Sequence, residues 1–376
     1  MTYWLYAGAW AVVRRLPERV AYRLFDLVAD VVWRRRPPAV LRLEANLRRA
    51  RPDAAPAELR ALSRAGLRSY LRYWCDAFRL PDWSHDRVVS SVRVVGEEHL
   101  RSSTGDGQRG VVGALMHMGN WDHAGAWASL TGVPVVTVAE RLQPERLYER
   151  FVAYREGLGM EILPLTGGDR DVLDVLAQRL RAGRLVPLLA DRDLRASGVE
   201  VQLLGEPTRM PPGPAMLALR TGAALHPVSI WPETVEGWPR PRLVIRFHEE
   251  VPAPESGTTR AKVTAMTQEV ADVFGAAIAE HPADWHMLQP LWLADLDPAR
   301  TRRTVGSPCR SGSSARTPGT CPGACSSTCG TWPRCCRPAA TACPCSHRPT
   351  TTPLSRRTSC QPAARCRCPT TARWRG

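Results

Sequence analysis

The chain has 376 residues, of which 44% are hydrophobic and 23% charged, the proportions of a globular protein with a sizeable core. Its net charge of +15 would suit a nucleic-acid-binding protein, but about 13 of its 51 basic residues and none of its 36 acidic residues lie beyond residue 300. The first 300 residues are therefore nearly neutral, and their charge excludes nucleic-acid binding as the expected function. They also hold a single cysteine, Cys75, and no secretory signal pattern, which excludes a disulfide-built secreted protein and indicates the cytosol.

Residues 3–36 mix apolar residues and arginines at helical spacing. The longest apolar run, residues 3–13, is shorter than the roughly 20 residues that a membrane-spanning helix needs. We expect a helical N-terminal collar that lies on the membrane surface, with Arg34, Arg35 and Arg36 near anionic head groups. The alternative is a buried helix flanked by solvated arginines.

Two further amphipathic helices are expected within residues 40–80, the second ended by Pro81. Short strand-like runs then alternate with helical stretches, which predicts one α/β domain with a central, mostly parallel sheet flanked by helices. The strand-like runs are GVVGALMH, PVVTVAE, MEILPL, LVPLLA, VEVQLLG, LHPVSIW and PRLVIRFHE. The helical stretches are 122–130, 145–158, 169–182, 214–221 and 263–280.

The segment LMHMGNWDHAG contains the first candidate site. His117 ends an apolar run at the carboxyl end of a predicted strand, where ligands of α/β sheets gather. Gly119 permits a tight turn, and Asp122 lies near the start of the next helix. A carboxylate that holds one tautomer of an imidazole makes its other nitrogen a general base. The alternative is that Asp122 only caps the helix.

The segment ADRDL follows a second apolar run and places Asp191, Arg192 and Asp193 at another strand end. Such a cluster could serve a developing oxyanion or a phosphate, or could be a charged turn. We find no G-x-S-x-G motif for a serine nucleophile, and His123 has no accompanying ligand set for a metal. His226 and His281 are expected to be structural.

Several segments in order resemble one family over residues 1–298: RYWCDAFRLP, HMGNWDHAGAW, YREGLGMEILPL, LADRDLRASGVEV, GEPTRMPPGPAMLALRTGA and DWHMLQP. The H-x-x-x-x-D pattern is the signature of acyl-CoA-dependent glycerolipid acyltransferases. The residues around this pattern more closely resemble the lipid A late-acyltransferase family, particularly its actinobacterial branch that acylates phosphatidylinositol mannosides.

The resemblance implies roles for named residues. His117 would deprotonate a sugar hydroxyl that attacks an acyl-CoA thioester directly, without an acyl-enzyme, while Asp122 orients His117. Asp191 would be the third catalytic residue, with Glu200 as its rival. The substrate-binding candidates are Arg141, Arg155, Arg192, Arg209 and Glu200, and the alternative for each arginine alone is a solvated surface position.

The implied function is transfer of a palmitoyl-like chain from acyl-CoA to a mannose hydroxyl of phosphatidylinositol mannoside, at the cytoplasmic face of the cell membrane. Acyl-CoA is a co-substrate; no cofactor, metal or nucleic acid is expected. The alternatives are an acyl-CoA-dependent acyltransferase for another glycolipid or a lysophospholipid, and a non-catalytic membrane scaffold of the same fold.

Residues 301–376 lack apolar periodicity and are rich in Pro, Ser, Thr, Arg and Cys. The spacing of Cys321, Cys325 and Cys329 fits no standard zinc pattern. Codons for residues 315–332 can be chosen so that a frame shifted by one base encodes CPYSWDVPGGVQFHVRDL, which resembles GDP-mannose-dependent phosphatidylinositol mannosyltransferases. We expect an acyltransferase domain over residues 1–300 and a disordered, frame-shifted, non-native tail over 301–376.

Overall fold

The computed structural model describes residues 2–139, 145–165, 171–193, 198–237 and 240–296. All of them belong to one compact unit that extends to Cys309. The expected domain boundary near residue 300, the 301–376 tail and Arg141 lie outside the described residues.

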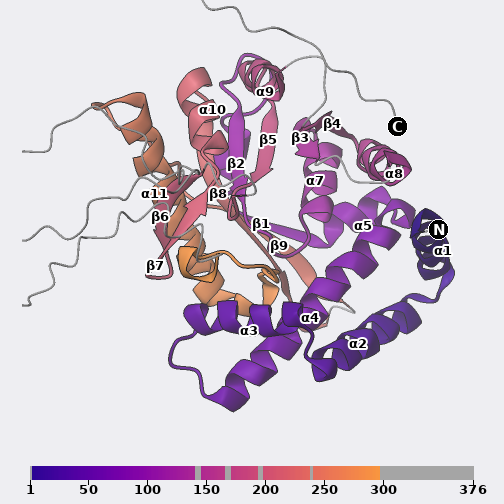
Figure 1. Ribbon diagram of the computed structural model, residues 1–376. Coiled ribbons are helices and arrows are strands. Elements are labelled where there is room, and N and C mark those ends of the chain that lie inside the picture. Colours follow the sequence, from indigo (N-terminus) through magenta and orange to yellow (C-terminus); the bar gives the residue numbers. More distant parts are fainter. Residues whose placement is uncertain (1, 140–144, 166–170, 194–197, 238–239, 297–376) are drawn as a thin grey trace, which may run out of the picture. The chain divides into compact units, whose positions relative to one another are not determined.

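Helices follow one another up to Ser90 at the end of α5, and helices then alternate with strands (Figure 1). The α-helices are α1 (Thr2–Arg15), α2 (Glu18–Arg35), α3 (Pro38–Ala50), α4 (Pro56–Arg79), α5 (His85–Ser90), α6 (Glu97–Arg101), α7 (Trp121–Leu130), α8 (Glu145–Glu156), α9 (Val172–Arg181), α10 (Gly213–Thr221) and α11 (Thr259–Glu280). Three short 3-10 helices are η1 (Leu80–Asp82), η2 (Pro282–Asp284) and η3 (Leu293–Asp295).

A seven-stranded sheet in the order β1-β9-β8-β2-β5-β3-β4 forms the centre. Its neighbouring strands are parallel except for β8 and β9, which confirms the predicted mostly parallel α/β sheet. The strands of this sheet are β1 (Val92–Val95), β2 (Val111–Leu115), β3 (Val135–Ala139), β4 (Met160–Pro164), β5 (Leu185–Leu189), β8 (Ala224–Glu233) and β9 (Arg242–Phe247).

The run VEVQLLG does not join this sheet. It forms β6 (Val199–Leu203), which pairs antiparallel with β7 (Glu206–Met210) as a separate hairpin. Strand β7 and the edge strand β1 were not among the predicted strands. Both are short; β1 is mostly half-buried and β7 mixes buried, half-buried and exposed positions, so neither shows the continuous apolar run of a central strand.

Two apolar clusters pack on the faces of the sheet. One gathers residues of α9, α10 and α11, and the other gathers residues of α4, α5, α7 and α8. Figure 1 shows the corresponding arrangement, with α10 and α11 on one side of β2 and α7 on the other. Strand β2 is buried along its whole length, as expected for a parallel strand covered on both faces. The end of β2 is therefore positioned by packing from both sides.

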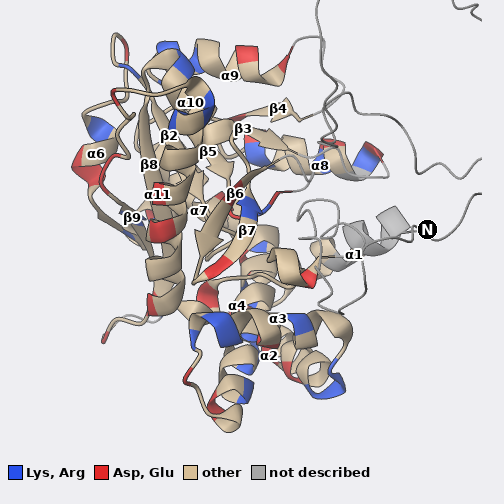
Figure 2. Cartoon of the chain, turned by 60° about the vertical axis from the view of Figure 1, so that its left-hand side comes forward, with Lys and Arg blue, Asp and Glu red and all other residues tan. Residues whose placement is uncertain are grey.

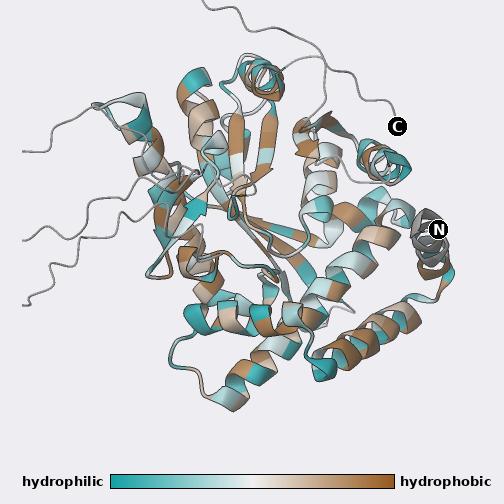
Figure 3. Cartoon of the chain, in the orientation of Figure 1, coloured by the Kyte–Doolittle hydropathy of each residue, from teal (hydrophilic) through white to brown (hydrophobic). Residues whose placement is uncertain are grey.

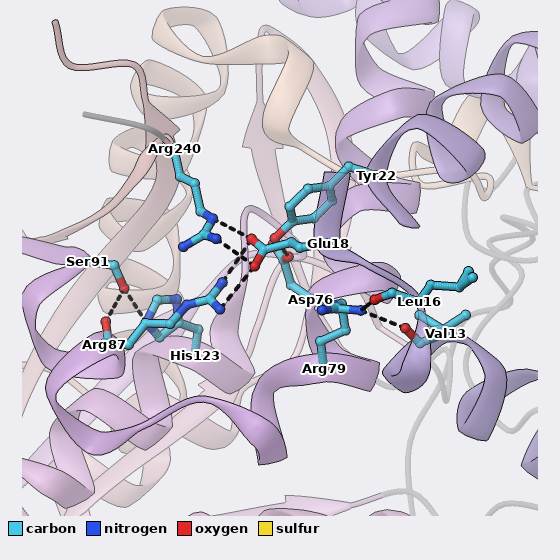
Figure 4. A network of polar contacts seen from close by, with 10 residues as sticks. All are labelled: Val13, Leu16, Glu18, Tyr22, Asp76, Arg79, Arg87, Ser91, His123 and Arg240. Atoms are coloured by element: carbon cyan, nitrogen blue, oxygen red, sulfur yellow. Dashed lines mark hydrogen bonds and ion pairs between the residues drawn. The ribbon is translucent and has the colours of Figure 1, made fainter. Parts of the chain in front are cut away.

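Side-chain hydrogen bonds attach the N-terminal helices to the rest of the domain. The carboxylate of Glu18 at the start of α2 accepts hydrogen bonds from Arg87 at 3.0 Å and from Arg240 at 2.7 Å, as Figure 4 shows. Arg79, at the end of α4, donates to the backbone oxygens of Val13 and Leu16. These contacts join the collar helices to α5 and to the segment that precedes β9.

Helix α2 leaves part of its apolar face uncovered (Figure 3). Val20, Leu24, Leu27 and Val28 are 42–58% exposed, whereas Ala29 on the opposite side is fully buried. Among the described residues, no helix combines the length and the hydropathy that crossing a bilayer requires. Basic and acidic side chains are interspersed on α2, α3 and α4 (Figure 2).

Candidate active site

His117 and Asp191 meet because they follow neighbouring parallel strands at the same register. Leu115 at the end of β2 lies opposite Leu189 at the end of β5, and each polar residue comes two positions later. His117 Nδ1 lies 2.6 Å from Asp191 Oδ1, and the His117 backbone N–H donates to Asp191 Oδ2 at 3.0 Å. A carboxylate at Nδ1 assigns the proton to that nitrogen and leaves Nε2 as a proton acceptor.

The environment of Asp191 keeps it ionised although it is fully buried. Burial alone would raise its pKa, but the charge of His117 and hydrogen bonds from His117 and from Trp285 Nε1, at 3.1 Å, hold the pKa below its ordinary value. A buried carboxylate fixed by three donors is well suited to orient an imidazole and to stabilise its protonated form.

Asp122 and His117 do not form the expected pair in the structure. Asp122 Oδ1 accepts from Arg155 Nε at 2.7 Å, and Asp122 Oδ2 accepts from the Tyr73 hydroxyl at 3.1 Å. Within the described residues, no hydrogen bond or ion pair joins Asp122 to His117, and Asp191 holds the imidazole instead. The physical reason is that Asp122 lies in the first turn of α7, where α4 and α8 supply its partners.

The alternative role for Asp122, as the helix cap, is also not observed. Asn120 caps α7, since its Oδ1 accepts from the backbone N–H of His123 at 3.0 Å. The charge of Asp122 raises the pKa of Arg155 against the effect of burial, so this arginine stays charged. Burial, followed by the charge of Asp122, raises the pKa of Tyr73 well above its usual value, so the phenol remains a donor.

The turn after His117 requires glycine, as predicted. Gly119 has a φ of +61°, and a Cβ at this position would lie 2.3 Å from the backbone oxygen of Ile230. Its N–H donates to the backbone oxygen of Asp284 at 3.0 Å. This hydrogen bond ties the turn to the segment that carries Trp285 and His286.

His117 lies where two cavities meet. The inner cavity, of about 260 Å³, extends between the sheet and α7 and has mainly apolar walls. Representative lining residues are Leu115, Val135, Met160, Leu185, Ile230 and Ile245. The outer cavity, of about 510 Å³, is lined by side chains of α4, α8 and the segment after η2. Its aromatic walls include Tyr70, Tyr73, Trp74, Tyr148 and Phe151. Both cavities share His117, Trp121, Arg155 and Arg192.

The predicted substrate-binding residues divide into two groups. Arg155 and Arg192 line both cavities. Arg209 and Glu200 face each other across the β6–β7 hairpin and line neither cavity, so the structure brings Asp191 rather than Glu200 to His117. Arg192 Nε is buried without a hydrogen-bond partner among the described residues, so this arginine has an unused donor atom in the region that His117 also lines.

Four aromatic residues of the site were not assigned from the sequence. Tyr73 binds Asp122, Trp121 lies edge-on to His117 at 5.9 Å between ring centroids, Trp285 binds Asp191, and His286 lines the outer cavity. Tyr73, Trp285 and His286 lie within RYWCDAFRLP and DWHMLQP, whose similarity to the family was the available signal. No local pattern connects those segments to His117.

The three other histidines considered in the sequence have partners away from His117. His123 Nε2 lies 3.0 Å from the backbone oxygen of Val88, and His226 Nδ1 lies 2.8 Å from that of His248. His281 stacks on Trp231 with 4.2 Å between ring centroids. Within the described residues, no three metal-ligating side chains gather at one point.

Comparison with known proteins extends over nearly all described residues. The family model of bacterial lipid A biosynthesis acyltransferases matches residues 1–294. A phosphatidylinositol mannoside acyltransferase of Mycolicibacterium smegmatis is 49% identical over 299 residues, which cover 79% of this chain and 93% of that protein. The protein of the same name from Mycobacterium tuberculosis is 47% identical over 302 residues, covering 80% and 91% respectively. The site described above therefore lies in a chain that belongs to the bacterial lipid A biosynthesis acyltransferase family.

Proposed function

We propose that this protein transfers a fatty acyl chain from acyl-CoA to a mannose hydroxyl of phosphatidylinositol mannoside. The observation that carries the proposal is the position of the His117–Asp191 pair at the junction of an apolar and an aromatic cavity. The substrate class follows the names of the two relatives, each of which matches this chain over more than nine-tenths of its own length.

The inner cavity suits the acyl chain of the donor. Its walls come from alternating apolar residues of the sheet and from α7. A hydrocarbon chain bound there is removed from water while few polar groups of the protein are desolvated. The thioester carbon at the end of that chain would then lie beside His117.

The outer cavity suits the acceptor sugar. The rings of Tyr73 and Trp121 lie 4.3 Å apart at the entrance to His117, and aromatic faces pack well against the C–H face of a sugar ring. A mannose hydroxyl in this cavity can hydrogen-bond to Nε2 of His117.

The chemistry then needs one proton carrier and no covalent enzyme intermediate. Nε2 of His117 takes the proton of the mannose hydroxyl while the hydroxyl oxygen bonds to the thioester carbonyl carbon. Asp191 stabilises the resulting imidazolium. When the tetrahedral intermediate collapses, the carbon–sulfur bond breaks, and the CoA thiolate takes the proton from His117.

Cations at the junction can stabilise the negative charges. Among the described residues Arg192 Nε has no hydrogen-bond partner, and Arg192 lines both cavities, so it suits the oxyanion of the intermediate or a CoA phosphate. Arg155 also lines both cavities, but its charge is already paired with Asp122. Cys75 is unsuited as a nucleophile because burial, followed by the charge of Asp76, raises the pKa of its thiol to about 12.

The protein is proposed to bind the cytoplasmic face of the cell membrane peripherally. The exposed apolar residues of α2 can enter the head-group region, and neighbouring arginines such as Arg23 and Arg34 can bind anionic lipids. Both the lipid acceptor and the acyl product would remain at that surface.

The test is product analysis with purified protein. Palmitoyl-CoA and mannosylated phosphatidylinositol should yield a product heavier by one acyl group in mass spectrometry. His117→Ala should lower the rate by roughly 10³-fold or more because the general base is lost. His85→Gln, an exposed histidine on α5, is the matched control and should leave the rate unchanged. Transfer only to a lysophospholipid would replace phosphatidylinositol mannoside as the proposed acceptor. No transfer to any acceptor would favour a non-catalytic membrane scaffold.

A further inference from the structure

A second imidazole, that of His286, lies beside the catalytic one. The backbone N–H of His286 donates to the backbone oxygen of His117 at 2.7 Å, and Gly119 N–H donates to Asp284. Met118 and Trp285 form the bridge between these two hydrogen bonds. The segment Asp284–His286 is thus held in register with His117–Gly119. His286 lines the outer cavity and is only 7% exposed.

One nitrogen of His286 is assigned by a short chain of hydrogen bonds. Ser69 Oγ lies 2.7 Å from Asp284 Oδ1 and 3.1 Å from His286 Nε2. A serine hydroxyl has a single hydrogen, and the Asp284 carboxylate can only accept it. Ser69 therefore accepts from His286, which places the imidazole proton on Nε2.

The other nitrogen of His286 is left as a lone-pair acceptor. Nδ1 is buried and has no hydrogen-bond partner among the described residues. Burial, followed by the charge of His117, lowers the pKa of His286 to about 3, so a second proton does not occupy Nδ1 at neutral pH. A buried acceptor without a donor is costly, which indicates that a donor belongs there.

The surroundings specify the kind of donor. The rings of Tyr70 and Tyr73 lie 5.5 Å and 6.2 Å from the His286 ring, and His117 closes the same cavity. A lone pair repels an anion and gives a cation no counter-charge, whereas a neutral hydroxyl both fits aromatic walls and donates. The hydroxyl that reacts is bonded to His117, so the donor to His286 must be a different one.

We propose that His286 is a specificity residue whose Nδ1 accepts a hydrogen bond from a second hydroxyl of the acceptor sugar. Because a backbone hydrogen bond joins His286 to His117, the two imidazoles are held at a fixed separation. They can therefore bind two hydroxyls of one sugar ring only when those hydroxyls match that separation. That separation selects which hydroxyl is acylated. The inference rests on the proposed acyl transfer to a sugar, and it adds a recognition contact to that reaction.

The kinetic test pairs protein variants with acceptors that lack single hydroxyls. One monodeoxy mannoside keeps the reacting hydroxyl but lacks the hydroxyl that binds His286. With the wild-type protein, kcat/KM for this acceptor should be roughly 10-fold lower than for the complete mannoside. His286→Phe should lose a similar factor with the complete acceptor and nothing further with that deoxy acceptor. His286→Asn, whose amide oxygen can lie near the Nδ1 position, should recover part of the loss.

The controls separate recognition from structure. KM for acyl-CoA should stay unchanged in all His286 variants. Ser69→Ala removes the acceptor for Nε2 and the donor to Asp284, and it should weaken the discrimination in the same direction. Equal losses of His286→Phe with every acceptor, or a raised KM for acyl-CoA, would overturn the proposal.

A spectroscopic measurement keeps the inference testable if no acyl transfer is found. In ¹⁵N-histidine-labelled protein, His286 should show the Nε2–H tautomer at pH 7, and methyl mannoside should shift the Nδ1 resonance in the direction of a hydrogen-bonded lone pair. Failure of catalysis alone would contradict the proposed function, whereas a protonated Nδ1 or an unchanged resonance under saturating mannoside would contradict the role of His286.

Discussion

Asp122 and Asp191 are two buried carboxylates in one site whose partners give them different roles. Asp191 receives donors from His117 and Trp285, whereas Asp122 receives them from Arg155 and Tyr73. The first carboxylate can respond to charge that develops on His117, the proposed general base. The second already has a full counter-charge, so it acts on the site through the position of Arg155.

Substitution should separate these two roles. Asp191→Asn should lower kcat by ~10³-fold with little change in KM, because an amide no longer holds the correct tautomer or stabilises the imidazolium. Steady-state kinetics with both substrates measures this effect. A loss expressed mainly in KM would contradict the orienting role.

Asp122→Asn should act mainly on stability, because it leaves the half-buried guanidinium of Arg155 without its counter-charge. We expect a loss of about 3 kcal/mol in the free energy of unfolding, measured by urea denaturation. Adding Arg155→Met should recover much of this loss, since the uncompensated charge is removed. A double variant no more stable than Asp122→Asn alone would contradict the explanation.

At the scale of elements, α2 has one face packed in the protein and one apolar face uncovered. Ala21 and Ala29 are buried, and Asp30 receives hydrogen bonds from Arg64 and Arg68 of α4 at 2.8 Å each. The protein thus holds α2 firmly while leucines on its other side stay in water. Such a face is consistent with the proposed membrane contact.

Leu24→Asp combined with Leu27→Asp should weaken binding to vesicles that contain phosphatidylinositol by 10-fold or more, since each leucine buried in lipid contributes roughly 1.5–3 kcal/mol. Co-sedimentation with vesicles measures the partition. Met216→Asp on α10, which is similarly exposed, is the matched control and should leave binding unchanged. Equal binding of the α2 variant would exclude α2 as the membrane-facing element.

At the scale of the whole molecule, several buried imidazoles couple stability to pH. Burial lowers the pKa of His123 and His248 to about 4 and that of His286 to about 3. The unfolded chain binds protons at these residues near pH 6.5, before the native protein does, so acidification below 6.5 favours unfolding. Asp76 and Asp284 act in the opposite direction, because burial raises their pKa to about 6 and the native protein binds those protons first.

His123 provides the clearest test of this coupling. The native protein excludes its proton down to about pH 4, so it contributes stability above pH 6.5 that is progressively lost between 6.5 and 4, at most about 3 kcal/mol. His123→Gln can keep the hydrogen bond to Val88 and does not titrate. Its free energy of unfolding should therefore fall less between pH 7.5 and 4.5 than that of the wild type. Parallel pH curves for the two proteins would contradict the linkage.

The sequence by itself determined the alternation of strands and helices, the strand end at His117, the glycine turn at Gly119 and the similarity to the family, because each depends on residues close together in the chain. Tertiary structure decided which carboxylate holds His117, because strand order and register bring together residues 74 positions apart. It also placed Trp285 on Asp191, 94 positions away, and His286 beside the base. Local spacing favoured Asp122, but a side chain in the first turn of a helix pairs with whatever packs against that helix, here α4 and α8.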